Sequence, residues 1–315
     1  MSFGGLWCVN LARDGERSDV SSPQAVSAEA VLAWRRDQLA LGGRSVDLDW
    51  LLDLGAGLRW SQLQRLLIDR TGSVVLTRSL DELAQFWRQH LEQEVPLQYL
   101  IGICPWRDVL LEVSPAALIP RQETEVLVDL ALECFSSSPP TRWIDLGTGS
   151  GAIAVSFSRA WPEADGHAVD CSADALGLAQ RNLDRLTDRG RCQLHEGNWW
   201  EALPATGLSF DLVVSNPPYI PSALVGDLDG VVRRHEPHLA LSGGRDGLNC
   251  LRDIIEGATA FLSPGGWLLL EHHHDQSEAV LSLMTNSGMR HPRAGLDLSG
   301  IKRFALAQSP GRPNP

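Results

Sequence analysis

Several kinds of residue and segment are scarce in this chain of 315 residues. Lys302 is its single lysine, and Tyr99 and Tyr219 are its two tyrosines. No run of about 18 apolar residues occurs, so a membrane-spanning helix is not expected. The six cysteines include no Cys-x-x-Cys pair, which argues against a zinc or redox motif. Residues 1–22 lack the apolar core of a signal peptide. We therefore expect a cytoplasmic protein with free thiols and a disordered tail over 1–22.

Basic residues are fewer than acidic ones. The chain has 27 Lys and Arg against 39 Asp and Glu, a formal net charge of −12. A surplus of negative charge repels polyanions, so direct binding of nucleic acid is not expected. The 43% hydrophobic and 21% charged residues are typical of folded globular chains, and the length suits two domains.

The hydrophobic pattern changes twice along the chain. Over 23–95, apolar residues recur at spacings of three and four, which is typical of a small helical bundle. Ser27 and Ser79 are suitable N-caps there, and the expected helices cover 28–41, 48–54, 60–70 and 80–93. Over 96–120 the period approaches two between prolines, which predicts a connector that contains a hairpin.

From 121 to 315, strand and helix patterns alternate. The strands expected are 142–146, 166–170, 192–196, 210–215, 266–271 and 301–308. The helices expected are 123–135, 151–160, 173–187, 247–262 and 276–287. This order predicts an α/β domain with an open, mostly parallel sheet wound on both faces, and ligands at the carboxyl ends of its strands.

A glycine loop joins the first of these strands to a helix, with the sequence Asp145-Leu146-Gly147-Thr148-Gly149-Ser150-Gly151. Asp170 ends the next strand, where its carboxylate can accept hydrogen bonds from ribose hydroxyls. Nicotinamide dinucleotides and S-adenosylmethionine both suit this arrangement. Asp145 favours S-adenosylmethionine, because a carboxylate there is badly placed against a pyrophosphate but well placed for an ammonium group.

Two further segments follow later strands. After the third, Asn198 and Trp199 are candidates for the edge and face of an adenine, whereas Trp200 is favoured as a core residue. After the fourth comes Asn216-Pro217-Pro218-Tyr219. The prolines stiffen this turn. The Asn216 oxygen and the Pro217 carbonyl can then grip both N–H bonds of one NH₂ group, with Tyr219 over its planar substituent, and aim the nitrogen lone pair at a sulfonium methyl.

Several motifs occur in an order that resembles a known family. They are Pro96-Leu97-Gln98-Tyr99-Leu100 with Gly102, Ile119-Pro120-Arg121-Gln122-Glu123-Thr124-Glu125, the glycine loop, Ala168-Val169-Asp170, Asn-Pro-Pro-Tyr, Glu236-Pro237, Ala240-Leu241-Ser242-Gly243-Gly244, Asp246-Gly247-Leu248, Pro264-Gly265-Gly266 and Glu271. The chain resembles the HemK/PrmC-type N5-glutamine methyltransferases of peptide chain release factors.

The resemblance implies a helical domain over 23–95 that helps dock the release factor, a hairpin connector over 96–120, and a Rossmann-like class I S-adenosylmethionine-dependent methyltransferase domain over 121–315. The implied substrate is the glutamine of a Gly-Gly-Gln motif. The implied roles are cofactor binding for Gly147 to Gly151, Asp170 and Trp199, and capture of the glutamine amide for Asn216, Pro217, Pro218 and Tyr219.

The chain departs from the family pattern at two places. Asn198 stands where the family usually has Asp, and His272-His273-His274 replaces an apolar residue and a glycine. Three adjacent histidines at a strand end cannot all face one ion, so no metal site is expected. Two alternatives stay open: methylation of a ribosomal-protein glutamine, and methylation of adenine N6 in DNA or RNA, which would need a basic track.

Overall fold

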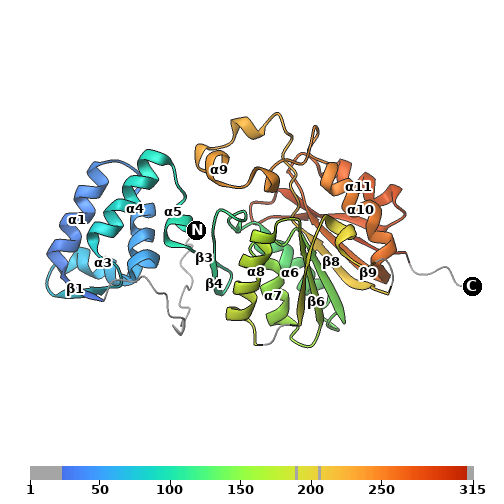
Figure 1. The fold of residues 1–315 in the computed structure, drawn as a ribbon, viewed down its shortest axis with the longest axis horizontal. Coiled ribbons are helices and arrows are strands. Elements are labelled where there is room, and N and C mark those ends of the chain that lie inside the picture. Colours follow the sequence, from blue (N-terminus) through green and yellow to red (C-terminus); the bar gives the residue numbers. More distant parts are fainter. Residues whose placement is uncertain (1–22, 189–190, 205–206, 311–315) are drawn as a thin grey trace, which may run out of the picture. The chain divides into compact units, whose positions relative to one another are not determined.

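The computed structural model describes residues 23–188, 191–204 and 207–310. The chain divides into two compact units, one ending at Ile101 and the other beginning at Gly102 (Figure 1). The tail expected over 1–22 lies outside the described residues. In the described part of the chain, no helix has the length and apolar character needed to cross a membrane.

The first unit is mainly helical. Its elements are β1 (Gln24–Ser27), α1 (Ala28–Ala40), α2 (Ser45–Trp50), a π-helical turn (Leu51–Gly55), α3 (Trp60–Ile68), β2 (Ser73–Leu76), α4 (Leu80–Gln93) and α5 (Leu97–Ile101). The four expected helices are confirmed. The antiparallel pair β1–β2 was not expected, because four-residue strands are too short to carry a readable alternation.

Two serines begin helices of this unit as the sequence predicts. The Ser27 hydroxyl accepts a hydrogen bond from the Ala30 amide at the start of α1. Ser79 and Glu82 accept from each other's backbone N–H groups at the start of α4, which satisfies two donors that the helix leaves open. The buried Trp87 indole donates to the Gln38 carbonyl, so α4 is tied to α1.

The second unit is an α/β fold. Its helices are α6 (Thr124–Cys134), α7 (Ala152–Ala160), α8 (Ala173–Leu186), α9 (Gly230–His235), α10 (Asn249–Phe261) and α11 (Ser277–Asn286). Its strands are β3 (Ile103–Trp106), β4 (Val109–Glu112), β5 (Arg142–Leu146), β6 (Asp165–Asp170), β7 (Cys192–Glu196), β8 (Phe210–Ser215), β9 (Leu262–Glu271), β10 (Arg290–Leu296) and β11 (Lys302–Gln308).

Seven of these strands form one sheet in the order β10-β11-β9-β8-β5-β6-β7. Neighbours from β9 to β7 are parallel, and β11 and β10 are antiparallel. The strand order reverses between β5 and β8, so the loops after these two strands diverge and leave a crevice at their carboxyl ends. The expected strands are confirmed, but β10 was not expected. This edge strand carries Pro292, His291 and two arginines instead of an alternating apolar pattern.

Alternate residues of the strands supply two separate cores. Trp143, Leu212 and Leu269 pack with α6 and α7 on one face, while neighbouring residues such as Ile144 and Val213 pack with α10 and α11 on the other. Figure 1 shows these helix pairs on opposite sides of the sheet. This period of two over buried strands is what a sheet covered on both faces requires.

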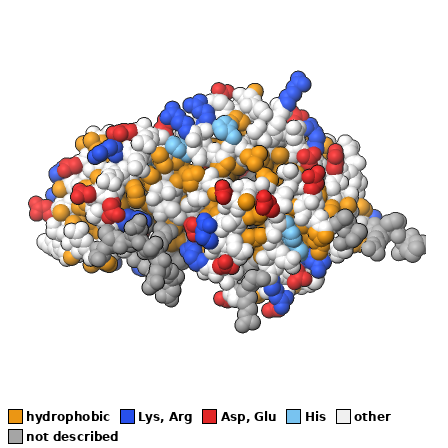
Figure 2. Space-filling view, in the orientation of Figure 1, with side chains coloured by type: hydrophobic (Ala, Val, Ile, Leu, Met, Phe, Trp, Pro, Cys, Tyr) orange, Lys and Arg blue, Asp and Glu red, His pale blue; other side chains and the backbone are white. Residues whose placement is uncertain are grey.

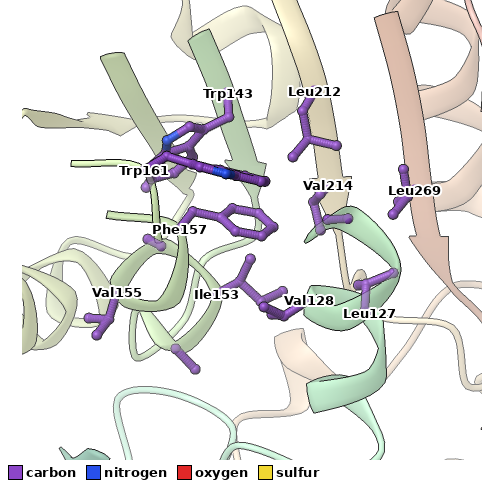
Figure 3. Packing of buried hydrophobic residues seen from close by; sticks show 14 of the residues in the cluster. Leu127, Val128, Trp143, Ile153, Val155, Phe157, Trp161, Leu212, Val214 and Leu269 are labelled. Carbon is purple, nitrogen blue, oxygen red and sulfur yellow. The ribbon is translucent and has the colours of Figure 1, made fainter. Parts of the chain in front are cut away.

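Aromatic rings fill the middle of the first core. The Phe157 ring meets Trp143 edge-on at 5.5 Å between centroids and stacks on Trp161 at 5.0 Å. Figure 3 shows these rings beside Leu212 and Val214. Gly166 is required next to them, because a Cβ there would lie 2.3 Å from the Trp143 ring. The packing holds β5, whose last residues lead into the glycine loop.

The hairpin expected within 96–120 is formed by β3 and β4. Trp106, Val109 and Leu111 of this hairpin pack into the core shared with α6 and α7. The buried Asn182 of α8 accepts from the Glu112 amide and donates to the Ser150 carbonyl. The hairpin is therefore part of the second unit, bonded through α8 to the glycine loop, while α5 belongs to the first unit.

Candidate active site

A cavity of about 300 Å³ opens at the carboxyl ends of the parallel strands of the second unit. Many of the site residues predicted from sequence line it: Gly147, Thr148, Gly149, Ser150, Asp170, Asn198, Trp199, Asn216 and Pro218. Asp145, Gly151, Pro217 and Tyr219 are not among its lining residues. The loops after β5 and β8 meet here because the strand order reverses between them.

The glycine loop needs glycine for two different reasons. Gly147, Gly149 and Gly151 have φ angles of +75°, +56° and +82°, a region that L side chains rarely adopt. A Cβ on Gly147 would lie 3.2 Å from the Trp199 ring, and one on Gly151 would lie 3.1 Å from Ala179. The loop can therefore lie against the Trp199 ring and against α8 at the same time.

Asp145 is fully buried beneath this loop. Its Oδ2 accepts from the Thr148 hydroxyl at 2.7 Å, and its Oδ1 has no partner among the described residues. Burial raises the pKa of Asp145 to about 7, the negative charge of Asp170 adds to the rise, and the Thr148 hydrogen bond opposes it. An unpartnered buried carboxylate oxygen is a fitting acceptor for an ammonium group, which would stabilise its ionised form.

Asp170 is held at the end of β6 by backbone donors. Its two carboxylate oxygens accept from the Gly149 amide at 2.9 Å and the Ser172 amide at 3.0 Å. Burial raises the pKa of Asp170, and these hydrogen bonds lower it. The side chain also lines the cavity. A carboxylate fixed in this way keeps lone pairs for vicinal hydroxyl groups.

The two adjacent tryptophans have different surroundings. Trp199 lines the cavity with Asn198 and adopts a positive φ of +45°. Trp200 stacks on Phe261 at 4.8 Å between ring centroids and donates to the Ile254 carbonyl. The interpretation of Trp200 as a packing residue agrees with these contacts, whereas Trp199 can offer an aromatic face to a ligand in the cavity.

The turn after β8 is anchored on both sides. The buried Ser215 hydroxyl donates to the Leu146 carbonyl at 2.6 Å, which joins the ends of β8 and β5. The Asn216 amide nitrogen donates to the Thr124 hydroxyl at 2.9 Å. Tyr219 donates from its hydroxyl to Glu271 and accepts at its carbonyl from Gln276. The Tyr219 ring is therefore held against residues behind the cavity rather than lining it.

Three polar residues of the site were given no chemical role from sequence. Thr124 begins α6 and donates to Glu271 at 2.7 Å. Burial raises the pKa of Glu271 to about 7, against hydrogen bonds from Thr124 and Tyr219 that lower it. The buried Glu236 accepts from the Ile119 amide and from Arg121, a cavity residue. All three stand in the segments that carry the family resemblance, which is the signal that singles them out.

The three adjacent histidines have separate surroundings. His272 is buried, its ring Nδ1 lies 2.7 Å from the His273 carbonyl, and burial lowers its pKa. His273 pairs with Asp275 at 2.6 Å. Within 23–188, 191–204 and 207–310, no three His, Cys, Asp or Glu residues are grouped in a way that could hold a metal ion.

Comparison with known proteins agrees with this geometry. Residues 122–226 match the family model of the Methyltransferase small domain. The chain is 53% identical to a release factor glutamine methyltransferase from Prochlorococcus marinus, over 90% of this chain and 98% of that one. It is 42% identical to one from Gloeobacter violaceus, over 87% and 95% of the two chains.

A solved structure shares the fold at low identity. The catalytic domain of hMettl16, in complex with a MAT2A 3′UTR hairpin, superposes with a TM-score of 0.52 at 14% identity, over 73% of this chain and 82% of that one. The second unit thus has the class I methyltransferase fold expected from the sequence. Because it aligns with these relatives over nearly their full length at 42% and 53% identity, the chain belongs to the family of release factor glutamine methyltransferases.

Proposed function

We propose that this protein transfers a methyl group from S-adenosylmethionine to the side-chain amide nitrogen of the glutamine in the Gly-Gly-Gln motif of peptide chain release factors. One observation carries the proposal: Asn216 lines the same cavity as the glycine loop and Asp170. An amide acceptor and a nucleoside-type site therefore share one cavity, in a chain whose relatives are named for this reaction.

The residues on one side of the cavity, with Asp145 beneath its glycine loop, suit S-adenosylmethionine, whose sulfonium supplies the methyl group when bound. Asp145 would take the ammonium group, because one of its buried oxygens has no partner among the described residues. Asp170 would accept from the ribose hydroxyls. Asn198 and Trp199 would contact the adenine by its edge and its face, and the open backbone of Gly147 to Gly151 would lie along the cofactor.

The turn after β8 supplies the other half of the chemistry. An amide nitrogen is a poor nucleophile because its lone pair is delocalised over the carbonyl. The Asn216 side-chain oxygen and the Pro217 carbonyl would accept its two N–H bonds, which aims the lone pair at the methyl group and stabilises positive charge that develops on nitrogen. Pro218 would keep the turn rigid. Tyr219 would support the turn from behind, through its hydrogen bond to Glu271.

The proposal extends to the first unit and to the cellular location. The helices of the unit that ends at Ile101 would help to dock the release factor, since the catalytic motifs lie in the second unit. Because release factors act in the cytoplasm, the reaction would take place there. Acidic and basic side chains are interspersed on the face drawn in Figure 2, and the net charge of −12 favours a protein substrate over nucleic acid.

Labelled methyl transfer tests the proposal directly. The protein is incubated with labelled S-adenosylmethionine and, in separate reactions, with a bacterial release factor, ribosomes and duplex DNA, and the methylated residue is mapped by mass spectrometry. Label on the glutamine of Gly-Gly-Gln is expected. Label on a ribosomal-protein glutamine or on adenine, with none on the release factor, would overturn it.

A further inference from the structure

The Asn216 side chain has two ends of opposite hydrogen-bonding character. Its oxygen accepts and its nitrogen donates, and the two are similar in size, so packing alone does not choose between them. The proposed function rests on this choice, because a substrate N–H can bond only to the oxygen. Asn216 therefore needs a neighbour that distinguishes nitrogen from oxygen.

Thr124 is that neighbour. Its hydroxyl lies 2.9 Å from the Asn216 nitrogen and 2.7 Å from Glu271 Oε2. A hydroxyl has one proton, and an ionised carboxylate can only accept. The Thr124 proton is therefore committed to Glu271, which leaves lone pairs facing Asn216. A lone pair pairs with an NH₂ group and repels an oxygen, so Oδ1 of Asn216 is the end left for a ligand in the cavity.

The surroundings protect this chain of hydrogen bonds from water. Thr124 is 5% exposed and Glu271 is 1% exposed, so a water molecule has little access to the bond between them. The other oxygen of Glu271 accepts from the Tyr219 hydroxyl at 3.1 Å. One carboxylate at the end of β9 thus organises the start of α6 and the turn after β8. Buried networks of this kind hold a single arrangement when every member is satisfied.

We infer that Thr124 and Glu271 are positioning residues for methyl transfer, which hold Asn216 with its oxygen toward the substrate amide, and that the negative charge of Glu271 sets the direction of the hydrogen bonds. The inference rests on the proposed function. It names two groups that act through Asn216: Glu271 is not among the residues that line the cavity, whereas Thr124 also lines it.

Protonation of Glu271 reverses the direction of these hydrogen bonds. A protonated carboxyl donates to Thr124, whose hydroxyl then donates to the Asn216 oxygen, and the amide turns its nitrogen toward the substrate. Burial and the charge of Glu123 raise the pKa of Glu271 to about 7, while hydrogen bonds from Thr124 and Tyr219 and the charge of Arg303 lower it. The buried ring of the adjacent His272 has a lowered pKa, which favours its neutral form. Methyl transfer should accordingly be lost as the pH falls through this range.

A matched pair of substitutions at Thr124 tests the positioning role. Thr124→Val keeps the shape and removes the hydroxyl, whereas Thr124→Ser keeps the hydroxyl. We expect Thr124→Val to lower kcat for release factor methylation about 100-fold, the order seen when one oriented hydrogen-bonding group of an active site is removed. Thr124→Ser should retain most of the activity, and both should bind S-adenosylmethionine like the wild type. A Thr124→Val protein with wild-type kcat would overturn the inference.

Glu271→Gln tests the charge. A neutral amide cannot impose the direction, so kcat at pH 8 should fall toward the wild-type value at pH 6. The acid limb of the pH profile of kcat should disappear when it is measured at saturating S-adenosylmethionine, so that protonation of Asp145 does not contribute. A wild-type kcat or a wild-type acid limb in this variant would show that the charge of Glu271 does not set the direction. Thermal unfolding followed by circular dichroism checks that each variant is folded. The Thr124 variants test the hydroxyl and the Glu271 variant tests the charge, so either result alone can overturn its part of the inference.

A readout without substrate separates this inference from the proposed function. The NMR signals of the Asn216 side-chain amide, assigned by their loss in Asn216→Ala, should shift with a midpoint near pH 7 in the wild type and show no such shift in Glu271→Gln. A missing midpoint overturns the inference even if glutamine is methylated. A clear midpoint without any glutamine methylation overturns the proposed function, but it still supports the orientation of Asn216 by Thr124 and Glu271.

Discussion

The two sides of the cavity are built from contacts that span very different separations along the sequence. On the cofactor side, Asp145 bonds to Thr148 three positions away, and Asp170 bonds to Ser172 two positions away and to Gly149 across 21. On the amide side, Asn216 bonds to Thr124 across 92 positions, and Thr124 to Glu271 across 147. A cofactor loop can thus be assembled largely by local backbone geometry, whereas the orientation of one amide needs three distant elements.

The two buried carboxylates express the same difference. Asp145 and Glu271 both have pKa values raised to about 7, chiefly by burial. Asp145 has one oxygen without a partner among the described residues, whereas both oxygens of Glu271 accept hydrogen bonds from the protein. One carboxylate is arranged to receive a ligand and the other to orient a neighbour, so they should respond differently to substitution.

The largest effect is expected from Asn216→Ala. Loss of the Asn216 side-chain oxygen, which would accept from the substrate amide, should lower the rate of methyl transfer by about 10²–10³-fold. The affinity for S-adenosylmethionine, measured by calorimetry, should stay near the wild-type value. Asn198→Ala is the matched control at the other side of the cavity, and it should weaken cofactor binding but preserve the rate at saturating cofactor. A large loss of cofactor affinity in Asn216→Ala would mean that the two sides are not separate.

Asp145→Asn should change how cofactor binding depends on pH. Below about pH 7 the wild-type Asp145 is protonated, its attraction for an ammonium group is lost, and the affinity should fall by up to about tenfold per pH unit. The variant should bind weakly at every pH, without this slope. Glu271→Gln should keep the wild-type slope in the same titration calorimetry. A flat slope in the wild type would contradict the proposed role of Asp145.

Tyr219→Phe should have a smaller effect, which is a shift of the pH profile in one direction. The Tyr219 hydrogen bond lowers the pKa of Glu271, so its removal raises that pKa and moves the acid limb of transfer to higher pH. The Thr124 bond stays, and kcat at high pH should fall only modestly. The free energy of unfolding should drop by about 1 kcal/mol, as for one lost hydrogen bond. An acid limb that moves to lower pH would contradict this network.

Trp200→Phe should have the smallest effect. An aromatic ring at 200 can still stack on Phe261, but the indole bond to the Ile254 carbonyl is lost. Chemical denaturation should show a loss of about 1 kcal/mol in the free energy of unfolding, with unchanged cofactor affinity and transfer rate. Trp199→Phe is the matched comparison, since it should weaken cofactor binding. Equal effects of the two substitutions on binding would mean that Trp200 also serves the site.

Much of the fold could be predicted from hydrophobic period. The buried strands of the sheet and the amphipathic helices carry strong patterns, and their existence is confirmed from α1 to β11. The prediction missed β10, because an edge strand with a proline and charged residues shows no alternation. It also missed β1 and β2, each of four residues, and α5 and α9, of five and six residues, because a period cannot be read over so short a span.

Local chemistry determined the position of the cofactor-type loop and the rigid turn. Glycine at positive φ and consecutive prolines act on the backbone where they stand, so their positions could be read from the sequence. The direction of Asn216 could not be read in this way. It depends on one hydroxyl proton shared with Glu271, and only the tertiary structure brings these groups within hydrogen-bonding distance.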